Sequence, residues 1–199
     1  MAVDIQATIK NLQGRGFAVS YFETGAEAVD YLTREIRGTT VGMGGSKTLD
    51  QLGLYEALSR ENQVTWHMLD IRMEVMRRAN AARVYLSSAN AVSQTGEVLV
   101  IDGRGNRISA LTFDKDAVYF VVGVNKLAET MEAALERARN VAAPRNAARL
   151  ERKTPCAVTG RCADCRSPER ICRGLLVLWE ALGGVGRTEI VLVNEELGY

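Results

Sequence analysis

An uninterrupted run of six apolar residues, 117–122, most narrows the folds open to this chain. A strand with one solvated face alternates apolar and polar residues, whereas a strand that is apolar throughout occurs in a sheet covered on both faces. Such strands are typical of parallel sheets, in which helical crossovers cover both sides. The run therefore predicts a buried sheet with helices on both of its faces.

Strand and helix patterns alternate through most of the chain, so we expect an α/β fold with a mainly parallel sheet. Thr24 and Glu27 have the spacing of a capping box at the start of a helix, and Thr48 and Gln51 repeat it. Strands are expected over 17–22, from 39, and over 63–69, 83–88, 97–102, 106–112, 117–122 and 188–193, with 97–102 and 106–112 as a hairpin. Helices are expected over 4–14 and 24–37, and a third begins at 48. A fourth follows the strand 63–69 and ends at about residue 80. A long helix capped by Asn125 continues until Pro144 interrupts it, and a last one follows Cys172 and runs through Trp179.

The composition indicates one globular domain spanning residues 1–199. The chain has 25 basic and 24 acidic residues, and this balance gives no support to a nucleic-acid partner or a membrane-surface partner. No apolar run is long enough to span a bilayer, and the first residues contain no apolar signal core. We therefore expect a cytoplasmic protein, with a homodimer left open as its assembly.

All four cysteines lie in one short segment, residues 153–173, with the spacing C-x5-C-x2-C-x6-C. Pro155, Gly160 and Pro168 indicate that this segment is a loop, which can wrap around an ion. Four thiolates can complete the shell of a tetrahedral zinc ion or of an iron–sulfur cluster. The sequence therefore predicts a shared metal site, in preference to two disulfides, with the ligands Cys156, Cys162, Cys165 and Cys172.

Two metals are compatible with the cysteine spacing. Zinc ribbons usually have two C-x2–4-C pairs, and here only Cys162 and Cys165 form one. The long outer spacings suit a [4Fe–4S] cluster better because its irons lie apart, and arginines beside the cysteines could offset its negative charge. Those arginines are equally compatible with a solvated basic surface. An iron–sulfur cluster is the favoured cofactor, with zinc as the alternative.

A glycine-rich segment, residues 42–48, joins a predicted strand to a predicted helix. Glycines let the backbone approach a ligand, and the free amides at a helix start favour an anion. The spacing matches neither the Walker A motif nor the dinucleotide fingerprint, and a plain tight turn is the alternative. The ligand-binding residues expected here are Gly44, Gly45, Ser46 and Thr48, with Lys47 as a cation.

Several segments in a consistent order resemble the lactate-utilisation (LUD) domain family, formerly listed among domains of unknown function. They are VGMGGSKTL at 41–49, SANAVSQTGE at 88–97, NR at 106–107, VVGVNK at 121–126, the segment 155–172, and VNEELGY at 193–199. The resemblance implies the fold shared by ribose-5-phosphate isomerase, glucosamine-phosphate deaminase and the coenzyme A transferases, in which the first glycine-rich turn faces the substrate. It also implies an association with L-lactate oxidation to pyruvate alongside iron–sulfur proteins. The family tends to have threonine, then aspartate or glutamate, then glycine where this chain has Gln94, Thr95 and Gly96, so the resemblance gives no support to an acidic role at 94 or 95.

If the sheet is parallel, the loops at the carboxyl ends of its strands should form the pocket. Glu97 is the carboxylate suited to act as general base or nucleophile, and Lys47 is the second catalytic candidate. A solvent-facing Glu97 at a hairpin start is the competing interpretation. His67 is more often packed than catalytic at such a position, and Arg107 is expected to bond to backbone carbonyls. The further ligand-binding residues expected are Asn90, Gln94, Thr95, Gly96, Asn125 and Lys126.

Two functions of different classes follow from these features. The first is a component of L-lactate or related hydroxy-acid oxidation, which as an enzyme would be an oxidoreductase component, with a small anionic metabolite and other lactate-oxidation subunits as partners. The second is a non-redox enzyme that acts on small phosphorylated or acyl-coenzyme A substrates and contains structural zinc. A purely binding subunit of a larger complex is a third interpretation.

Overall fold

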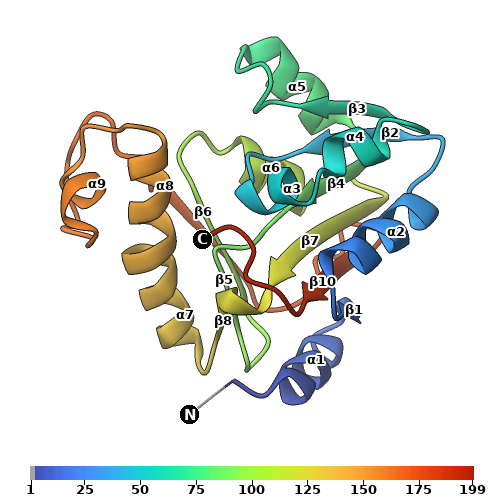
Figure 1. The fold of residues 1–199 in the computed structure, drawn as a ribbon, viewed down its shortest axis with the longest axis horizontal. Helices are drawn as coiled ribbons and strands as arrows, with labels where there is room; N and C mark the ends of the chain where they lie inside the picture. The colour runs from blue at the N-terminus through green and yellow to red at the C-terminus, as the bar shows by residue number, and fades with distance from the viewer. Residues whose placement is uncertain (1–2) are drawn as a thin grey trace.

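A computed structural model describes residues 3–199, and its centre is a six-stranded sheet in which all neighbouring strands run parallel (Figure 1). The strand order is β1-β10-β7-β4-β2-β3. The strands are β1 (Ala18–Phe22), β10 (Thr188–Val193), β7 (Ala117–Gly123), β4 (Val84–Ser87), β2 (Thr40–Met43) and β3 (Gln63–Trp66). The predicted α/β class with a mainly parallel sheet is confirmed.

Strand β7 lies in the interior of this sheet and is buried along its whole length, as its composition predicts. Val118 and Phe120 belong to the apolar cluster that includes α1, α5 and α6, whereas Tyr119 and Val121 belong to the cluster that includes α2, α3 and α4. Both faces of the sheet are therefore covered by helices. These helices are α1 (Ile5–Gly14), α2 (Gly25–Glu35), α3 (Lys47–Gln51), α4 (Leu54–Leu58), α5 (Met73–Ala81) and α6 (Asn106–Thr112).

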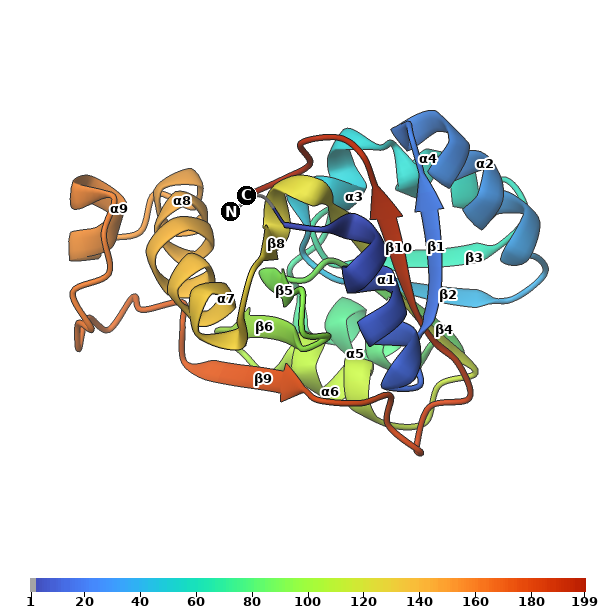
Figure 2. The same ribbon diagram turned by 90° about the horizontal axis from the view of Figure 1, so that it is seen from below.

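A smaller mixed sheet, which the sequence did not predict, has the order β8-β5-β6-β9. Its strands are β8 (Leu127–Ala128), β5 (Ala91–Ser93), β6 (Val98–Asp102) and β9 (Gly174–Leu178). Val98 and Val100 of β6 face the main core, whereas Leu99 and Ile101 face a third apolar cluster formed with helices from the chain after residue 130. Those helices are α7 (Met131–Arg137) and α8 (Ala143–Arg149), and Figure 2 shows them with α9 (Pro155–Thr159) at one end of the molecule.

The predicted hairpin of 97–102 with 106–112 is wrong in its second half, because 106–112 forms helix α6. The carboxylate of Asp102 accepts hydrogen bonds from the amides of Arg107 and Ile108 at 2.9 and 3.1 Å. An acceptor at the start of a helix satisfies amides that have no partner within it. Strand β6 pairs instead with β5 and β9, antiparallel to both.

The predicted helix after Cys172 is also wrong, because residues 174–178 form strand β9 along the edge of β6. A short apolar run is compatible with either a helix or a strand, and its pairing decides between them. Here β6 supplies five paired positions, from Asp102 opposite Gly174 to Val98 opposite Leu178.

The capping box of Thr24 and Glu27 is confirmed, since each side chain bonds to the other's backbone amide. The second predicted box, Thr48 with Gln51, is wrong because the cap of helix α3 is Ser46, two residues earlier. There the hydroxyl of Ser46 accepts from the amide of Leu49 at 3.3 Å.

Asn125 does not cap the long helix, which starts at Met131 with Thr130 as its cap. The helical run continues through Pro144 by way of a π-helical turn, Ala138–Ala142, and Pro144 lies in the first turn of α8. Proline is tolerated there because a helix start does not need its missing amide proton. No helix within residues 3–199 is long and apolar enough to cross a membrane.

Candidate functional site

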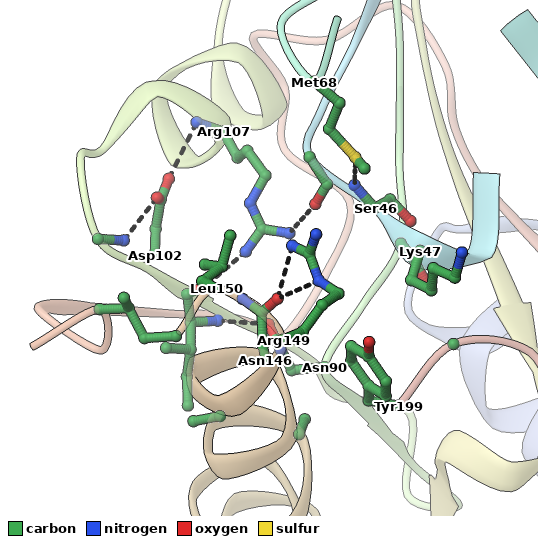
Figure 3. Close-up of a pocket in the computed structure, with 18 of the residues that line it drawn as sticks. Ser46, Lys47, Met68, Asn90, Asp102, Arg107, Asn146, Arg149, Leu150 and Tyr199 are labelled. Atoms are coloured by element: carbon green, nitrogen blue, oxygen red, sulfur yellow. Dashed lines mark hydrogen bonds between the residues drawn. The ribbon is translucent and has the colours of Figure 1, made fainter. Parts of the chain in front are cut away.

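The carboxyl ends of strands β2, β3, β4 and β7 meet at a cavity of about 330 Å³ (Figure 3). The turn after β2 contributes residues 45–48, and His67, Ser88 and Lys126 follow the other three strands. Residues 101–107 and the C-terminal part of α8 form the remaining wall. Ligands of open parallel sheets bind outside the carboxyl ends of the strands, so the predicted location of the site agrees with this cavity.

Most of the charged side chains in the described lining of this cavity are basic. Figure 3 shows the side chains of Arg107 and Arg149 extending from α6 and α8 towards the same space. Among the described lining side chains, Asp102 supplies the one carboxylate. The basic lining side chains are Lys47, Arg104, Arg107, Lys126, Arg149 and Arg152. Such an excess of positive charge in a partly enclosed space favours an anionic ligand.

The carboxylate of Asp102 is already engaged by the backbone. One oxygen accepts from the amides of Gly103 and Arg104 at 2.7 and 3.2 Å, and the other from those of Arg107 and Ile108. Burial alone would raise the pKa of Asp102, but the Arg107 charge and these amides outweigh it and lower the pKa. Asp102 is therefore an ionised anchor that fixes the start of α6 and leaves most of the cavity's positive charge available.

Arg107 connects the wall of the cavity to the glycine-rich turn. Its guanidinium donates to the carbonyl oxygens of Ile101 and Gly45, which confirms the predicted bonding to backbone carbonyls. A Cβ at Gly44 would lie 2.9 Å from Ser87 Oγ and 3.1 Å from Arg107 Cδ. Glycine at position 44 thus leaves the space that Arg107 occupies.

Lys126 is almost completely buried, with 4% of its surface exposed, yet it lines the cavity. Its Nζ donates to Thr48 Oγ1 at 2.7 Å and to Ser88 Oγ at 2.8 Å. The pKa of Lys126 is lowered to about 7, chiefly by burial and to a smaller extent by the charges of Arg137 and Arg107. The hydroxyls can accept from the ammonium but carry no negative charge to stabilise it, so near pH 7 a large fraction of this amine is uncharged.

The segment after β10 covers the site. Leu197 is buried and its amide donates to Asn125 Oδ1 at 3.1 Å, while the amide of Gly198 donates to Gln51 Oε1 at 2.6 Å. Gly198 and Tyr199 line the cavity. Asn125 does not line it, and its side chain holds this covering segment in place instead of binding the ligand as predicted.

His67 lines the cavity, with its ring against the glycine-rich turn. A Cβ at Gly45 would lie 3.0 Å from His67 Nε2. The pKa of His67 is lowered, chiefly by burial and to a smaller extent by the charge of Arg107, so the ring is neutral near pH 7. Its Nδ1 is buried without a hydrogen-bond partner among residues 3–199. A neutral ring of this kind adds hydrogen-bonding capacity beside the anion-binding groups.

Lys47 and Asn90 line the cavity as predicted, but neither is placed for chemistry. The ammonium of Lys47 is 2.5 Å from the carboxylate of Asp50, and both side chains are about two-fifths exposed. The amide oxygen of Asn90 accepts from the amide of Ile101 at 2.7 Å, which fixes the two strands β5 and β6 beside the cavity.

Glu97 lies away from the cavity, and its predicted catalytic role has no structural basis there. It is buried in an ion pair with Arg15 at 2.6 Å and accepts hydrogen bonds from the hydroxyls of Ser93 and Thr95. Burial would raise the pKa of Glu97, but these hydroxyls and Arg15 outweigh it and lower the pKa. The carboxylate therefore joins the β5–β6 turn to α1.

Gln94, Thr95 and Gly96 belong to the same turn and are likewise absent from the described lining. The side chain of Gln94 accepts from the amide of Asp4, and the carbonyl of Thr95 accepts from Arg15. The turn packs on α1 because β5 leads the chain away from the carboxyl edge of the main sheet. Of the predicted residues, those that line the cavity are Gly45, Ser46, Lys47, Thr48, Asn90 and Lys126.

Comparison with known families agrees with this architecture. The model of the LUD domain matches residues 5–193 of the chain. The chain belongs to the LUD domain family. This LUD domain is similar in fold to a crystal structure of a DUF162 family protein from Deinococcus radiodurans, with a TM-score of 0.56. The two share 15% sequence identity over 95% of each chain, which establishes the fold alone. No curated protein matches the chain.

The cysteine segment of this LUD domain lies beside α7 and α8. Cys162 and Cys172 line a second cavity of about 280 Å³, which also contains Arg139, Arg170 and Arg173. The Sγ of Cys162 accepts from Arg139 at 3.6 Å. The positive charge around these two thiols fits thiolates or another anionic group.

The other two cysteines lie outside this second cavity. Cys156 is the second residue of helix α9, where it lines a separate groove beside α8, and Cys165 is partly exposed. All four cysteines are free thiols, and among residues 3–199 no three or more Cys, His, Asp or Glu are placed to hold a metal ion. In this conformation, therefore, the four thiols do not fit a single metal centre.

Several lining residues were not predicted from the sequence. They come from the start of α6 and from α8 with the residues after it, which are far from the glycine-rich turn in sequence. A usable signal was present in α8, where Asn146 and Arg149 are three positions apart on a helix otherwise rich in alanine. The residues missed are Asp102, Arg104, Asn106, Asn146, Arg149 and Arg152.

Proposed function

We propose that this LUD protein binds a small anionic metabolite in the basic cavity, as a cytoplasmic component of the oxidation of L-lactate or a related 2-hydroxy acid. The observation that carries the proposal is the convergence of six basic side chains on a cavity whose carboxylate, Asp102, is already bonded to backbone amides. The family's lactate-utilisation character supports the hydroxy-acid assignment. Other subunits of lactate oxidation would be its partners.

The residues of the cavity provide the two kinds of donor that a hydroxy acid or 2-oxo acid needs. The guanidinium groups of Arg107 and Arg149 can donate to a carboxylate through the N–H groups that are not already bonded to Gly45, Ile101 and Asn146. The hydroxyls of Thr48 and Ser88 can exchange hydrogen bonds with a neutral oxygen next to it. The covering segment at Gly198 and Tyr199 limits water on one side, which strengthens these contacts.

Titration calorimetry tests the proposal. L-Lactate and pyruvate should bind to the wild-type protein, and Arg149→Gln should weaken that binding about tenfold, as expected when one charge-assisted hydrogen bond is lost. Arg145→Gln is the matched control, because Arg145 lies on the same helix, is exposed and does not line the cavity. Binding of neither compound, or equal affinities in the two variants, would contradict the proposal.

A second candidate is an enzyme for small phosphorylated or acyl-coenzyme A substrates. The observation in its favour is the size and charge of the cavity: about 330 Å³ exceeds the need of a three-carbon acid, and the four arginines in the described lining exceed the need of one carboxylate. Inorganic phosphate, a sugar phosphate and a coenzyme A ester belong in the same calorimetric series. Tighter binding of one of these than of lactate and pyruvate favours this candidate.

For the cysteine segment we propose an iron–sulfur cluster, with zinc as the alternative, formed by a rearrangement that brings Cys156 and Cys165 to Cys162 and Cys172. The basic side chains beside Cys162 and Cys172 support the site, since they offset thiolate charge. Iron, sulfide and zinc are to be measured on protein purified without oxygen, with Cys162→Ser as the variant. Absence of both metals from the wild type, or full metal content in the variant, would contradict a shared centre.

A further inference from the structure

The geometry assigns to Lys126 the role of a nucleophile that forms an imine with a 2-oxo acid, the oxidised form of a 2-hydroxy acid. This inference rests on the proposed binding of such acids in the cavity. It differs from the sequence-based expectation, in which Lys47 is the catalytic lysine and Lys126 only binds the ligand.

The first support is the placement of the amine. Lys126 follows the central strand β7, lines the cavity, and has its Nζ fixed by Thr48 Oγ1 and Ser88 Oγ at 2.7 and 2.8 Å. Both partners are neutral hydroxyls, so the amine has no carboxylate that would keep it protonated. Lys47 also lines the cavity, but it is partly exposed and pairs with Asp50.

The second support is the charge around the amine. Arg107 and Arg137 are close enough for their charges, together with burial, to bring the pKa of Lys126 to about 7. A lysine with its usual pKa is neutral at pH 7 in less than about one molecule in a thousand, whereas a lysine with a pKa of 7 is neutral in about half. A neutral amine beside guanidinium groups suits a ligand that has a carbonyl carbon next to a carboxylate.

The step is balanced without any further reactant. The lone pair of Nζ attacks the carbonyl carbon at C2, a C–N bond forms, and the π bond of the carbonyl breaks. The two protons of the amine transfer to the former carbonyl oxygen, which leaves as water when the C=N bond forms. The hydroxyls of Thr48 and Ser88, already bonded to Nζ, are placed to pass these protons. A 2-hydroxy acid has no such carbonyl and cannot react this way.

Reductive trapping tests the inference. The whole protein is incubated with pyruvate and cyanoborohydride, which reduces an imine to a stable secondary amine, and the modified lysine is located by peptide mass spectrometry. We expect the adduct on Lys126, and none when L-lactate replaces pyruvate. Lys115 is an internal control in the same sample, because it is also buried but donates to the carbonyls of Phe113 and Asp114 outside the cavity.

The outcomes separate this inference from the proposed function, because pyruvate binding is measured independently by calorimetry. Pyruvate binding without an adduct, or with equal modification of Lys115 and Lys126, overturns the imine and leaves anion binding intact. Lys126→Arg should bind pyruvate but yield no adduct. Thr48→Val is a second variant, and it should slow trapping while it leaves Lys126 in place. The unmodified chain alone suffices for the test if Lys126→Arg does not fold.

Discussion

Replacement of Lys126 by methionine should change the pH dependence of stability in a way that is specific to this residue. The pKa of Lys126 falls from 10.5 to about 7 in the folded protein. Between these pH values the unfolded chain binds a proton that the folded chain does not, so the free energy of unfolding rises with pH across this window. Lys126→Met removes the titrating group, and its stability should lack this rise.

The size of the effect follows from the two pKa values. The buried lysine costs the wild-type protein about 5 kcal/mol at pH 6, where folding requires a buried ammonium, and about 2 kcal/mol at pH 9. The stability of Lys126→Met relative to the wild type should therefore fall by about 3 kcal/mol from pH 6 to pH 9. The hydroxyls of Thr48 and Ser88 lose their donor in the variant, but this penalty is the same at both pH values and cancels from the difference.

Urea unfolding followed by circular dichroism at pH 6, 7.5 and 9 measures this quantity, because each free energy is compared with that of the wild type at the same pH. In melting temperature the change is on the order of 10 °C for a chain of this length. Lys47→Met is the matched control: Lys47 is partly exposed in a surface pair, so its effect should stay within about 1 kcal/mol at every pH. Parallel pH profiles for wild type and Lys126→Met would refute a buried amine with a lowered pKa.

Three further changes separate binding from architecture. Glu97→Gln should destabilise the fold by about 1–3 kcal/mol, since Arg15 then loses a buried charged partner. The affinity for the anionic ligand, measured by calorimetry, should stay unchanged. A loss of affinity without a loss of stability would restore a role for Glu97 at the site. Arg149→Gln should weaken the ligand about tenfold and reduce the dependence of affinity on salt, and an unchanged salt dependence would speak against a direct contact. Gly198→Ala should loosen the covering segment and raise the dissociation constant of the ligand. A Cβ at this position would lie 2.6 Å from Thr48 Oγ1, and the residue has a φ of +67°. Unaltered hydrogen-exchange protection of this segment would contradict that expectation.

The parallel sheet was predictable because its signal is local. Strand β7 is apolar on both sides, and only a sheet covered on both faces can accommodate that composition. The capping box at Thr24 was predictable for the same reason, since its two partners lie three residues apart. The segments 106–112 and 174–178 were assigned wrongly because the structure of each depends on a contact outside the segment itself, and for 174–178 the partner strand lies far earlier in the sequence. Asp102 bonds to the amides of α6, and β6 pairs with β9.

The residues of the site divide in the same way, into those with a local sequence signal and those placed by contacts elsewhere in the fold. The glycine-rich turn and Lys126 were found because both lie at carboxyl ends of strands, where ligands of such sheets bind. Glu97 was misassigned because it is close to Asn90 in sequence, whereas the short strand β5 separates the two in space and places Glu97 against Arg15. Arg149 was missed because the spacing of Asn146 and Arg149 indicates only a shared polar face of the helix, and does not show that α8 packs beside the cavity.

The two cavities share part of one wall, and this links the anion site to the cysteine segment. Ile101 and Ala143 line both cavities, and Ile171, immediately before Cys172, lines the anion cavity. The segment that begins at Lys153 directly follows Arg152, a basic residue of the anion site. A rearrangement of the cysteine segment that displaces this shared wall would also move atoms that line the proposed anion site. Because coupling between two sites is reciprocal, an anion that favours one arrangement of this wall would change the affinity of the segment for metal by the same factor.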